Sequence, residues 1–286
     1  MSFFSPDYET PGAGVPENEP QKPGPIRYFI VSGRKFWDMV VLNLLYFLFS
    51  LPAIAIYTLI GLLFLGNAGD AVGGALAAEG MTDIQILELK AAVHIVLSVG
   101  FGFLMTALLG SGAPRAGLSF VLRNYSREEH AFLWSDFWEN TKKNLGKGTV
   151  IFLIDVLFTF IICLDIASYG GAGTFWGLIA SYIALFIFII YILMHPYIYM
   201  ILVTFGLKLK AAYKNAFMLT AVKIFQNAGC LVSAVVMTLV ILELANRWPV
   251  LMFLLLMAVF SFPCLILDMN SFSVVKKYMI KENNDD

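Results

Sequence analysis

Six long apolar blocks constrain the fold of this chain more than any other feature of its sequence. Each block is near or above the roughly 17–25 residues that a helix needs to cross a bilayer. A helix satisfies its backbone hydrogen bonds within its own segment, which makes it the default structure for crossing lipid. The blocks therefore predict an all-α, polytopic membrane protein with six transmembrane helices. The predicted spans cover residues 37–66, 91–110, 149–166, 174–205, 229–245 and 248–267.

The distribution of lysine and arginine supports six spans. Of the 19 such residues, only Lys90 and Arg247 fall in the first, third or fifth connection between spans. The others precede the first span, follow the sixth, or lie in the second and fourth connections. Segments on the cytoplasmic side of a membrane carry an excess of these residues. We therefore expect both termini to be cytoplasmic.

The two ends of the chain differ in composition from its middle. The first 25 residues hold six of the 11 prolines and too little apolar surface to fold. We expect residues 1–33 to be a disordered cytoplasmic tail, residues 34–275 the transmembrane domain, and residues 276–286 a polar cytoplasmic tail. No apolar core with a cleavage site precedes the first span, so we expect that span to be an uncleaved anchor.

The second cytoplasmic connection predicts an amphipathic helix. Apolar residues recur at steps of three and four between Leu133 and Leu145, opposite a face that carries lysines. Ser126 and Glu129 have capping-box spacing, and Gly146 can end such a helix. The helix is either a membrane-surface linker or a docking helix for a partner. The candidate docking surface, with a second cluster in the fourth connection, comprises Trp134, Phe137, Trp138, Lys142, Lys143, Lys210, Tyr213 and Lys214.

The spans follow one another as three hairpins of similar plan. Each outward span follows a basic, partly amphipathic lead-in, and each inward span contains or meets a proline, at Pro114, Pro196 and Pro263. Internal repeats are common in membrane transporters. The similarity here is weak, and any six-span chain with this charge distribution shows part of it. Three repeated hairpins are therefore one interpretation of the sequence.

Four polar residues lie within or at the ends of the apolar blocks. They are Asn43, Asp155, His195 and Asp268, and helical rise places them in the inner half of the bilayer or near its midplane. Ionisable residues inside a membrane are costly and often functional. One interpretation is a substrate or ion site reached from the cytoplasm. The other is structural, with each side chain hydrogen-bonded between helices.

The sequence argues against several classes of function. A net charge of −1 provides no basic field for nucleic acid, and no nucleic-acid-binding motif occurs. We find no P-loop, nucleophile elbow, HExxH or dinucleotide-binding glycine pattern, and so expect neither enzymatic activity nor a cofactor. His94 and His195 are too few and too far apart in sequence to suggest a metal site. The three cysteines lie in apolar blocks, where packing is their simplest role.

Two passages resemble the YesL-like family of bacterial integral membrane proteins, which is a domain-of-unknown-function family (domain of unknown function 624). They are RKFWDMVVLNLLYFLFSLPAIAIY at residues 34–57 and GSGAPRAGLSFVLRNYSREEHAFLWSDFWENTKKNLGKGT at residues 110–149. The connection after the first span looks longer than the family's link, which we interpret as an insertion on the outer side. The resemblance implies a multispan protein of the bacterial cell membrane, often encoded beside carbohydrate ABC importers. It transfers no catalytic residues.

Three functions fit these observations. The favoured one is an accessory or regulatory partner of a carbohydrate ABC import system, which binds subunits of that transporter through its basic cytoplasmic segments. A second is a small-solute transporter that uses the polar residues of the inner half. A third is a structural protein that organises lipid, since basic segments also attract anionic headgroups of the bilayer. The sequence indicates neither a substrate nor an oligomeric state.

Overall fold

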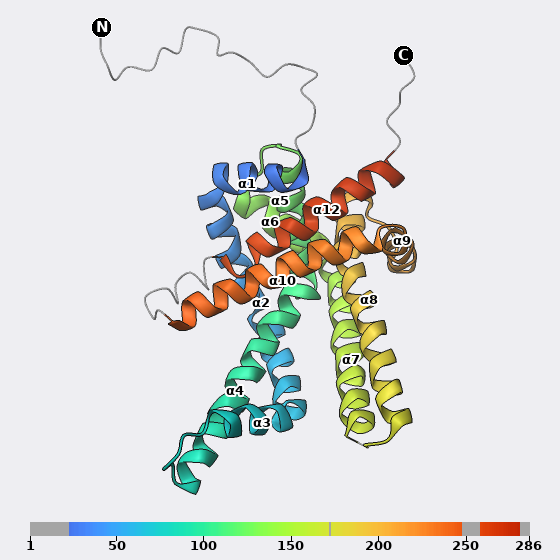
Figure 1. Ribbon diagram of the computed structural model, residues 1–286. Coiled ribbons are helices and arrows are strands. Elements are labelled where there is room, and N and C mark those ends of the chain that lie inside the picture. The colour runs from blue at the N-terminus through green and yellow to red at the C-terminus, as the bar shows by residue number, and fades with distance from the viewer. Residues whose placement is uncertain (1–22, 172, 248–257, 281–286) are drawn as a thin grey trace, which may run out of the picture.

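The chain forms helices and no strand over the residues that its computed structural model describes, which are 23–171, 173–247 and 258–280. The predicted all-α fold is therefore confirmed. The helices, coloured along the chain in Figure 1, are α1 (Gly24–Arg34), α2 (Phe36–Phe64), α3 (Gly66–Leu76), α4 (Asp83–Leu108), α5 (Ala113–Ser126), α6 (Leu133–Lys143), α7 (Leu145–Gly170), α8 (Phe175–Phe205), α9 (Leu209–Val222), α10 (Ile224–Arg247) and α12 (Ser261–Met279).

Five of these helices are long and apolar enough to cross a membrane, which makes this a multi-pass membrane protein. They are α2, α4, α7, α8 and the part of α10 from Ile224 to Ile241, with mean hydropathies of 2.0 to 2.6. Each coincides with one of the first five predicted spans. The sixth prediction, residues 248–267, begins outside the described residues and ends in α12.

The long helices pair as hairpins that meet in a common centre (Figure 1). Helix α2 packs on α4, α7 on α8, and α10 on α12. The first two hairpins extend away from the end of the molecule where α1 begins and α12 ends, whereas α10 and α12 run across its upper half in the same view. Three segments form the centre, which we call the hub: α5, residues 194–205 of α8, and α12, all packed against one another.

Contacts around the hub follow a cyclic order. A short helix covers each hub segment: α6 packs on α5, α9 on α8, and α1 on α12. The long helix that follows each short helix also touches the same hub segment, because α7 contacts α5, α10 contacts α8, and α2 contacts α12. Each hub segment is thus packed against the helices of the next hairpin along the chain. The cycle closes because α12, the last hub segment, packs against α1 and α2 of the first hairpin. The three hairpins therefore contact the hub in the same order, and the repeat itself stays a prediction.

The three short helices, which we call lead-in helices, end in the same way. Each is separated from the long helix after it by one residue outside helical geometry: Lys35 (φ −109°, ψ 23°), Asn144 (−103°, 13°) and Lys223 (−124°, 33°). A buried hydroxyl lies three positions before each break and another lies fifteen positions after it. The first set is Ser32, Thr141 and Thr220, and the second is Ser50, Thr159 and Thr238. The three lead-in helices and the long helices after them therefore share one register of buried hydroxyls.

Glycines bring the first hairpin into close contact along its length. A Cβ added to Gly61 would lie 2.9 Å from the Cα of Ser98, and one added to Gly73 would lie 2.7 Å from the Cα of Lys90. Small residues allow helix backbones in membranes to approach this closely. The segment interpreted as an insertion thus includes α3, which packs on α4 instead of projecting as a loop.

Several predicted boundaries were wrong. The predicted tail of residues 1–33 includes α1, because Val31 and Ser32 bury one face of that helix; residues 1–22 lie outside the described residues. At the other end, α12 continues to Met279 into the predicted polar tail. Ser126 does not begin a helix but ends α5, where its hydroxyl donates to the carbonyl of Arg123. Helix α6 begins at Leu133 and ends before Asn144, and Gly146 lies inside α7.

Candidate functional site

Asn43, on α2, binds the start of α12 rather than joining the other polar residues. Its side-chain oxygen accepts hydrogen bonds from the backbone N–H groups of Phe260, at 2.7 Å, and of Ser261, at 2.9 Å. Free N–H groups at a buried helix start need such acceptors. Asn43 is fully buried and therefore fixes the return of the third hairpin onto the first.

We expect Asn43→Leu to lower the free energy of unfolding by about 1–3 kcal/mol, because two buried N–H groups lose their acceptor. Thermal unfolding of the purified protein, followed by size-exclusion chromatography in detergent, measures the change. The neighbouring Leu44 is 42% exposed. Leu44→Ala is the control, and an equal loss in both variants would contradict the capping role of Asn43.

Asp268 forms a buried, bidentate ion pair with Arg115. The two guanidinium nitrogens of Arg115 donate to the carboxylate at 2.8 and 2.9 Å, and one of them also donates to the hydroxyl of Ser119 at 2.7 Å. Asp268 is fully buried and Arg115 is 2% exposed. The pair joins α5 to α12 at the centre of the hub. Fork-to-fork pairing fixes both side chains in one orientation.

Asp155 and His195 form the second buried pair, between α7 and α8. The Nε2 atom of His195 lies 3.1 Å from Oδ1 of Asp155, and the Tyr191 hydroxyl donates to the same oxygen at 2.6 Å. Asp155 is fully buried and His195 is 1% exposed. Each residue is about 15 Å along its helix from the end that carries the lead-in helices. The pair therefore lies deep inside the two spans.

Unpartnered polar atoms surround the Asp155–His195 pair. Within the described residues, Oδ2 of Asp155 accepts no hydrogen bond, and neither ring nitrogen of His195 is aligned to make one. The same is true of the buried hydroxyls of Thr159, which is one helical turn from Asp155, and of Tyr57 and Tyr199. Buried polar groups normally have partners, so a group of them without any indicates a site that binds something.

Tyrosines connect this pair to its surroundings. The Tyr199 ring lies 6.0 Å from the His195 ring and 5.6 Å from the Arg115 guanidinium, and so stands between the two buried pairs. On α9, burial and then the nearby Asp155 carboxylate raise the pKa of Tyr213 above its ordinary value, so its hydroxyl keeps its proton. The arrangement can donate several hydrogen bonds toward one carboxylate.

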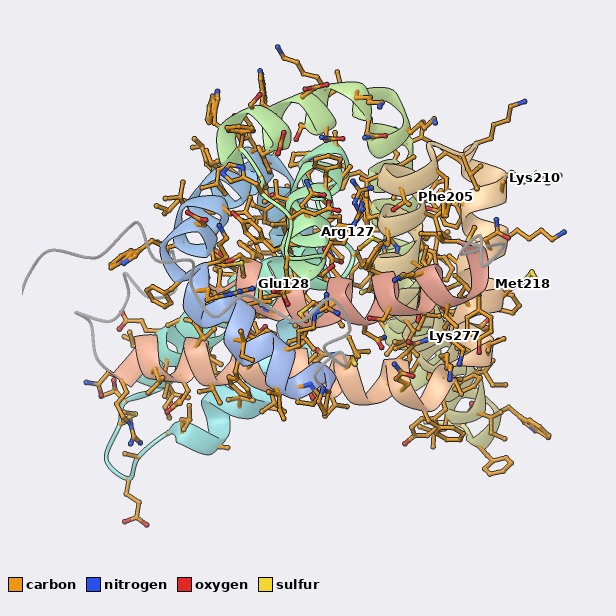
Figure 2. All side chains as sticks on the ribbon, turned by 90° about the horizontal axis from the view of Figure 1, so that it is seen from above. Arg127, Glu128, Phe205, Lys210, Met218 and Lys277 are labelled. Carbon is orange, nitrogen blue, oxygen red and sulfur yellow. The ribbon has the colours of Figure 1, made fainter. Side chains whose placement is uncertain are left out.

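The predicted docking residues lie on two separate helices, α6 and α9. Trp134 is 58% exposed on α6, where Lys142 and Lys143 are also exposed; the Trp138 ring is half-buried, 6.3 Å from the Trp134 ring and under the Lys142 ammonium. Lys210 and Lys214 are exposed on α9. Figure 2 shows Lys210, Met218 and Lys277 toward one side of the molecule, away from Arg127 and Glu128.

Phe137 and Tyr213 face inward and do not contribute exposed surface. Phe137 is fully buried, and a Cβ on Gly117 of α5 would lie only 2.5 Å from its carbonyl oxygen. Helix α6 is therefore fixed to α5 along one face. Tyr213 is half-buried beside Tyr191, near Asp155. The exposed part of the predicted surface is Trp134, Lys142 and Lys143 on α6 and Lys210 and Lys214 on α9.

Sequence reasoning missed Arg115 and the tyrosines around Asp155. Arg115 was counted among the basic residues of a cytoplasmic connection, yet it lies inside the hub. A usable signal did exist for the tyrosines, because Tyr191, His195 and Tyr199 recur at four-residue steps on one face of α8. Among the residues that the structure describes, no three His, Cys, Asp or Glu side chains lie close enough together to hold a metal ion.

Comparison with known proteins identifies a similarity for the first half of the chain. Residues 39–166 match the family described as "Protein of unknown function, DUF624". The matched range runs from α2 into α7 and contains Asn43, Arg115 and Asp155, whereas His195 and Asp268 follow it. No curated protein and no solved structure matches the chain.

Proposed function

We propose that this protein is a non-enzymatic accessory subunit of a membrane assembly, and that its partner is a carbohydrate ABC import system of the bacterial cell membrane. The partner class comes from the resemblance to YesL-like proteins. In this proposal the lead-in helices face the cytoplasm, and helix α6 binds a membrane subunit of the importer. The match to a family of unknown function is compatible with such a role.

The observation that carries the proposal is the outer face of α6. Its inner face is packed on α5, so the helix presents Trp134 and two lysines on a rigid support, with Phe132 (70% exposed) just before its first residue. Rigid aromatic side chains contribute most of the binding energy at many interfaces, because little conformational freedom is lost on binding. The position of α6 next to the spans favours a partner that is itself in the membrane.

The alternative of a small-solute transporter that uses all four polar residues has less support. Asn43 is occupied as a helix cap, and Asp268 is occupied by Arg115. Only Asp155 and His195 retain unpartnered atoms. These two residues do not require solute transport, and they are considered separately below.

A photo-reactive amino acid at position 134 tests the docking role in the full-length protein in its native membrane. We expect crosslinks to a membrane subunit of the importer, identified by mass spectrometry. Trp134→Ala should lower recovery of that subunit in mild detergent by roughly 30-fold, because truncating a central tryptophan costs about 2 kcal/mol or more.

Trp176 provides a matched control. It is 76% exposed at the start of α8, at the far end of the α7–α8 hairpin from α6. Trp176→Ala should leave recovery unchanged, and a probe at position 176 should not reach the importer. Crosslinks from position 134 to lipid alone, or equal losses in the two variants, would contradict the proposed role.

A further inference from the structure

We propose that the Asp155–His195 pair is a proton-binding site inside the membrane domain. The inference is independent of the docking role of α6, because it rests on different residues. The proton site also differs from the solute site predicted from the sequence. It excludes Asn43 and Asp268, and its ligand is a proton, which needs no cavity.

The first argument is charge. From α8, Asp155 faces Tyr191, His195 and Tyr199; from α2 it faces Tyr57, and from α9 Tyr213. Of these groups only His195 can become a cation near neutral pH. Arg115, whose guanidinium lies 5.6 Å from the Tyr199 ring, is bound by Asp268 through two hydrogen bonds. A lone buried carboxylate is costly, so binding one proton at this pair removes the net charge.

The second argument is the set of unpartnered atoms. Both nitrogens of His195 and Oδ2 of Asp155 lack hydrogen bonds, although each residue is at least 99% buried. A proton on the imidazole gives both nitrogens a hydrogen to donate, with Nε2 already 3.1 Å from the carboxylate. The hydroxyls of Thr159, Tyr57 and Tyr199 are buried donors that also lack partners, and Asp155 acts electrostatically on both tyrosines.

The binding step is simple to balance. One proton leaves a hydronium ion in bulk water, which becomes water, and bonds to the free ring nitrogen of neutral His195. The pair changes from a net charge of −1 to 0, and Tyr191 continues to donate to Oδ1 of Asp155. Tyr191 lies beside Tyr213 on α9, so these hydroxyls lead from the half-buried face of that helix toward the pair.

Infrared difference spectroscopy of the full-length protein in lipid nanodiscs, titrated from alkaline to acid pH, tests the proposal. The wild type should show imidazole protonation coupled to a change in one carboxylate band. His195→Gln should transfer the proton to Asp155, so that a protonated-carboxyl band appears which the wild type lacks. Asp155→Asn should remove both signals.

Asp165 supplies the matched control, because it lies ten residues further along α7 and is half-exposed. Asp165→Asn should leave the titration unchanged. If Asp155→Asn does not fold, isotope-labelled aspartate and histidine in the wild type assign the same bands. Absence of a histidine-coupled carboxylate change would overturn the proposal. So would a titration that shifts when sodium replaces choline at constant ionic strength, since that result indicates an alkali cation.

Discussion

Asp268→Leu is expected to lower the free energy of unfolding by about 3–5 kcal/mol, because it leaves the Arg115 guanidinium buried without a counter-charge. Both side chains are at least 97% buried at the centre of the hub, where neither can reach water without separating α5 from α12. We expect most of this variant to aggregate on extraction. Thermal unfolding by size-exclusion chromatography measures the loss in the fraction that remains folded.

The double variant Arg115→Met, Asp268→Leu decides whether the charge or the lost volume is responsible. Removing both charges avoids the uncompensated ion, and a buried pair replaced by apolar residues is often tolerated. We expect the double variant to regain at least half of the stability that Asp268→Leu loses. A double variant as unstable as the sum of the two single variants would contradict an ion-pair role.

Gly148→Ala is expected to destabilise the protein by about 1–3 kcal/mol, although replacing glycine by alanine inside a helix normally stabilises it. The added Cβ would lie 2.6 Å from the Cα of Ala113, where α7 crosses the start of α5. On the α5 side, Gly112 has φ +77°, and a Cβ added to it would lie 2.6 Å from the carbonyl oxygen of Gly148. The Cβ added at Gly148 would meet backbone atoms of α5 and of the residue before it, so no side chain can rotate to relieve the contact.

Gly146 is the matched control for this prediction. It lies in the same helix two residues earlier, and nothing lies within 4 Å of a Cβ added there. Gly146→Ala should therefore raise the free energy of unfolding by about 0.5–1 kcal/mol, because it lowers the entropy of the unfolded chain. The unfolding temperature should rise slightly as a result. The two substitutions should act in opposite directions. The same sign for both would show that α7 does not touch α5 as described.

The spans could be predicted from the sequence because burial in lipid requires long uninterrupted apolar segments. Their order as hairpins also followed from the sequence. Helix α7 ends at Gly170 and α8 begins at Phe175, so Asp155 and Tyr191 lie at similar distances along the chain from these two helix ends, and His195 follows one helical turn later. That two ionisable residues in apolar blocks face each other was therefore accessible to sequence reasoning. Only the structure shows that the atoms around them lack partners.

The hub could not be predicted because its polar residues resemble ordinary residues of a cytoplasmic connection. Arg115 follows Gly110 and Gly112, which have positive φ values of +100° and +77°. These two residues turn the chain after α4 so that α5 returns into the protein instead of leaving it. Hydropathy depends on local composition alone and contains no information on distant partners. Arg115 can be buried only because Asp268, 153 residues later in the chain, binds its guanidinium. Asn43 has the same dependence on the distant start of α12.

Thiol labelling from the two sides of the membrane tests the central claim, which is that all three lead-in helices and the end of α12 share one face (Figure 1). Single cysteines replace Lys142, Lys210 or Lys277, and Glu79 near the far end of the first hairpin, in a chain whose three native cysteines are alanine. An impermeant maleimide added to inside-out vesicles should modify the first three and spare position 79. Right-side-out vesicles should show the reverse. Labelling of positions 142 and 277 from opposite sides would contradict the account.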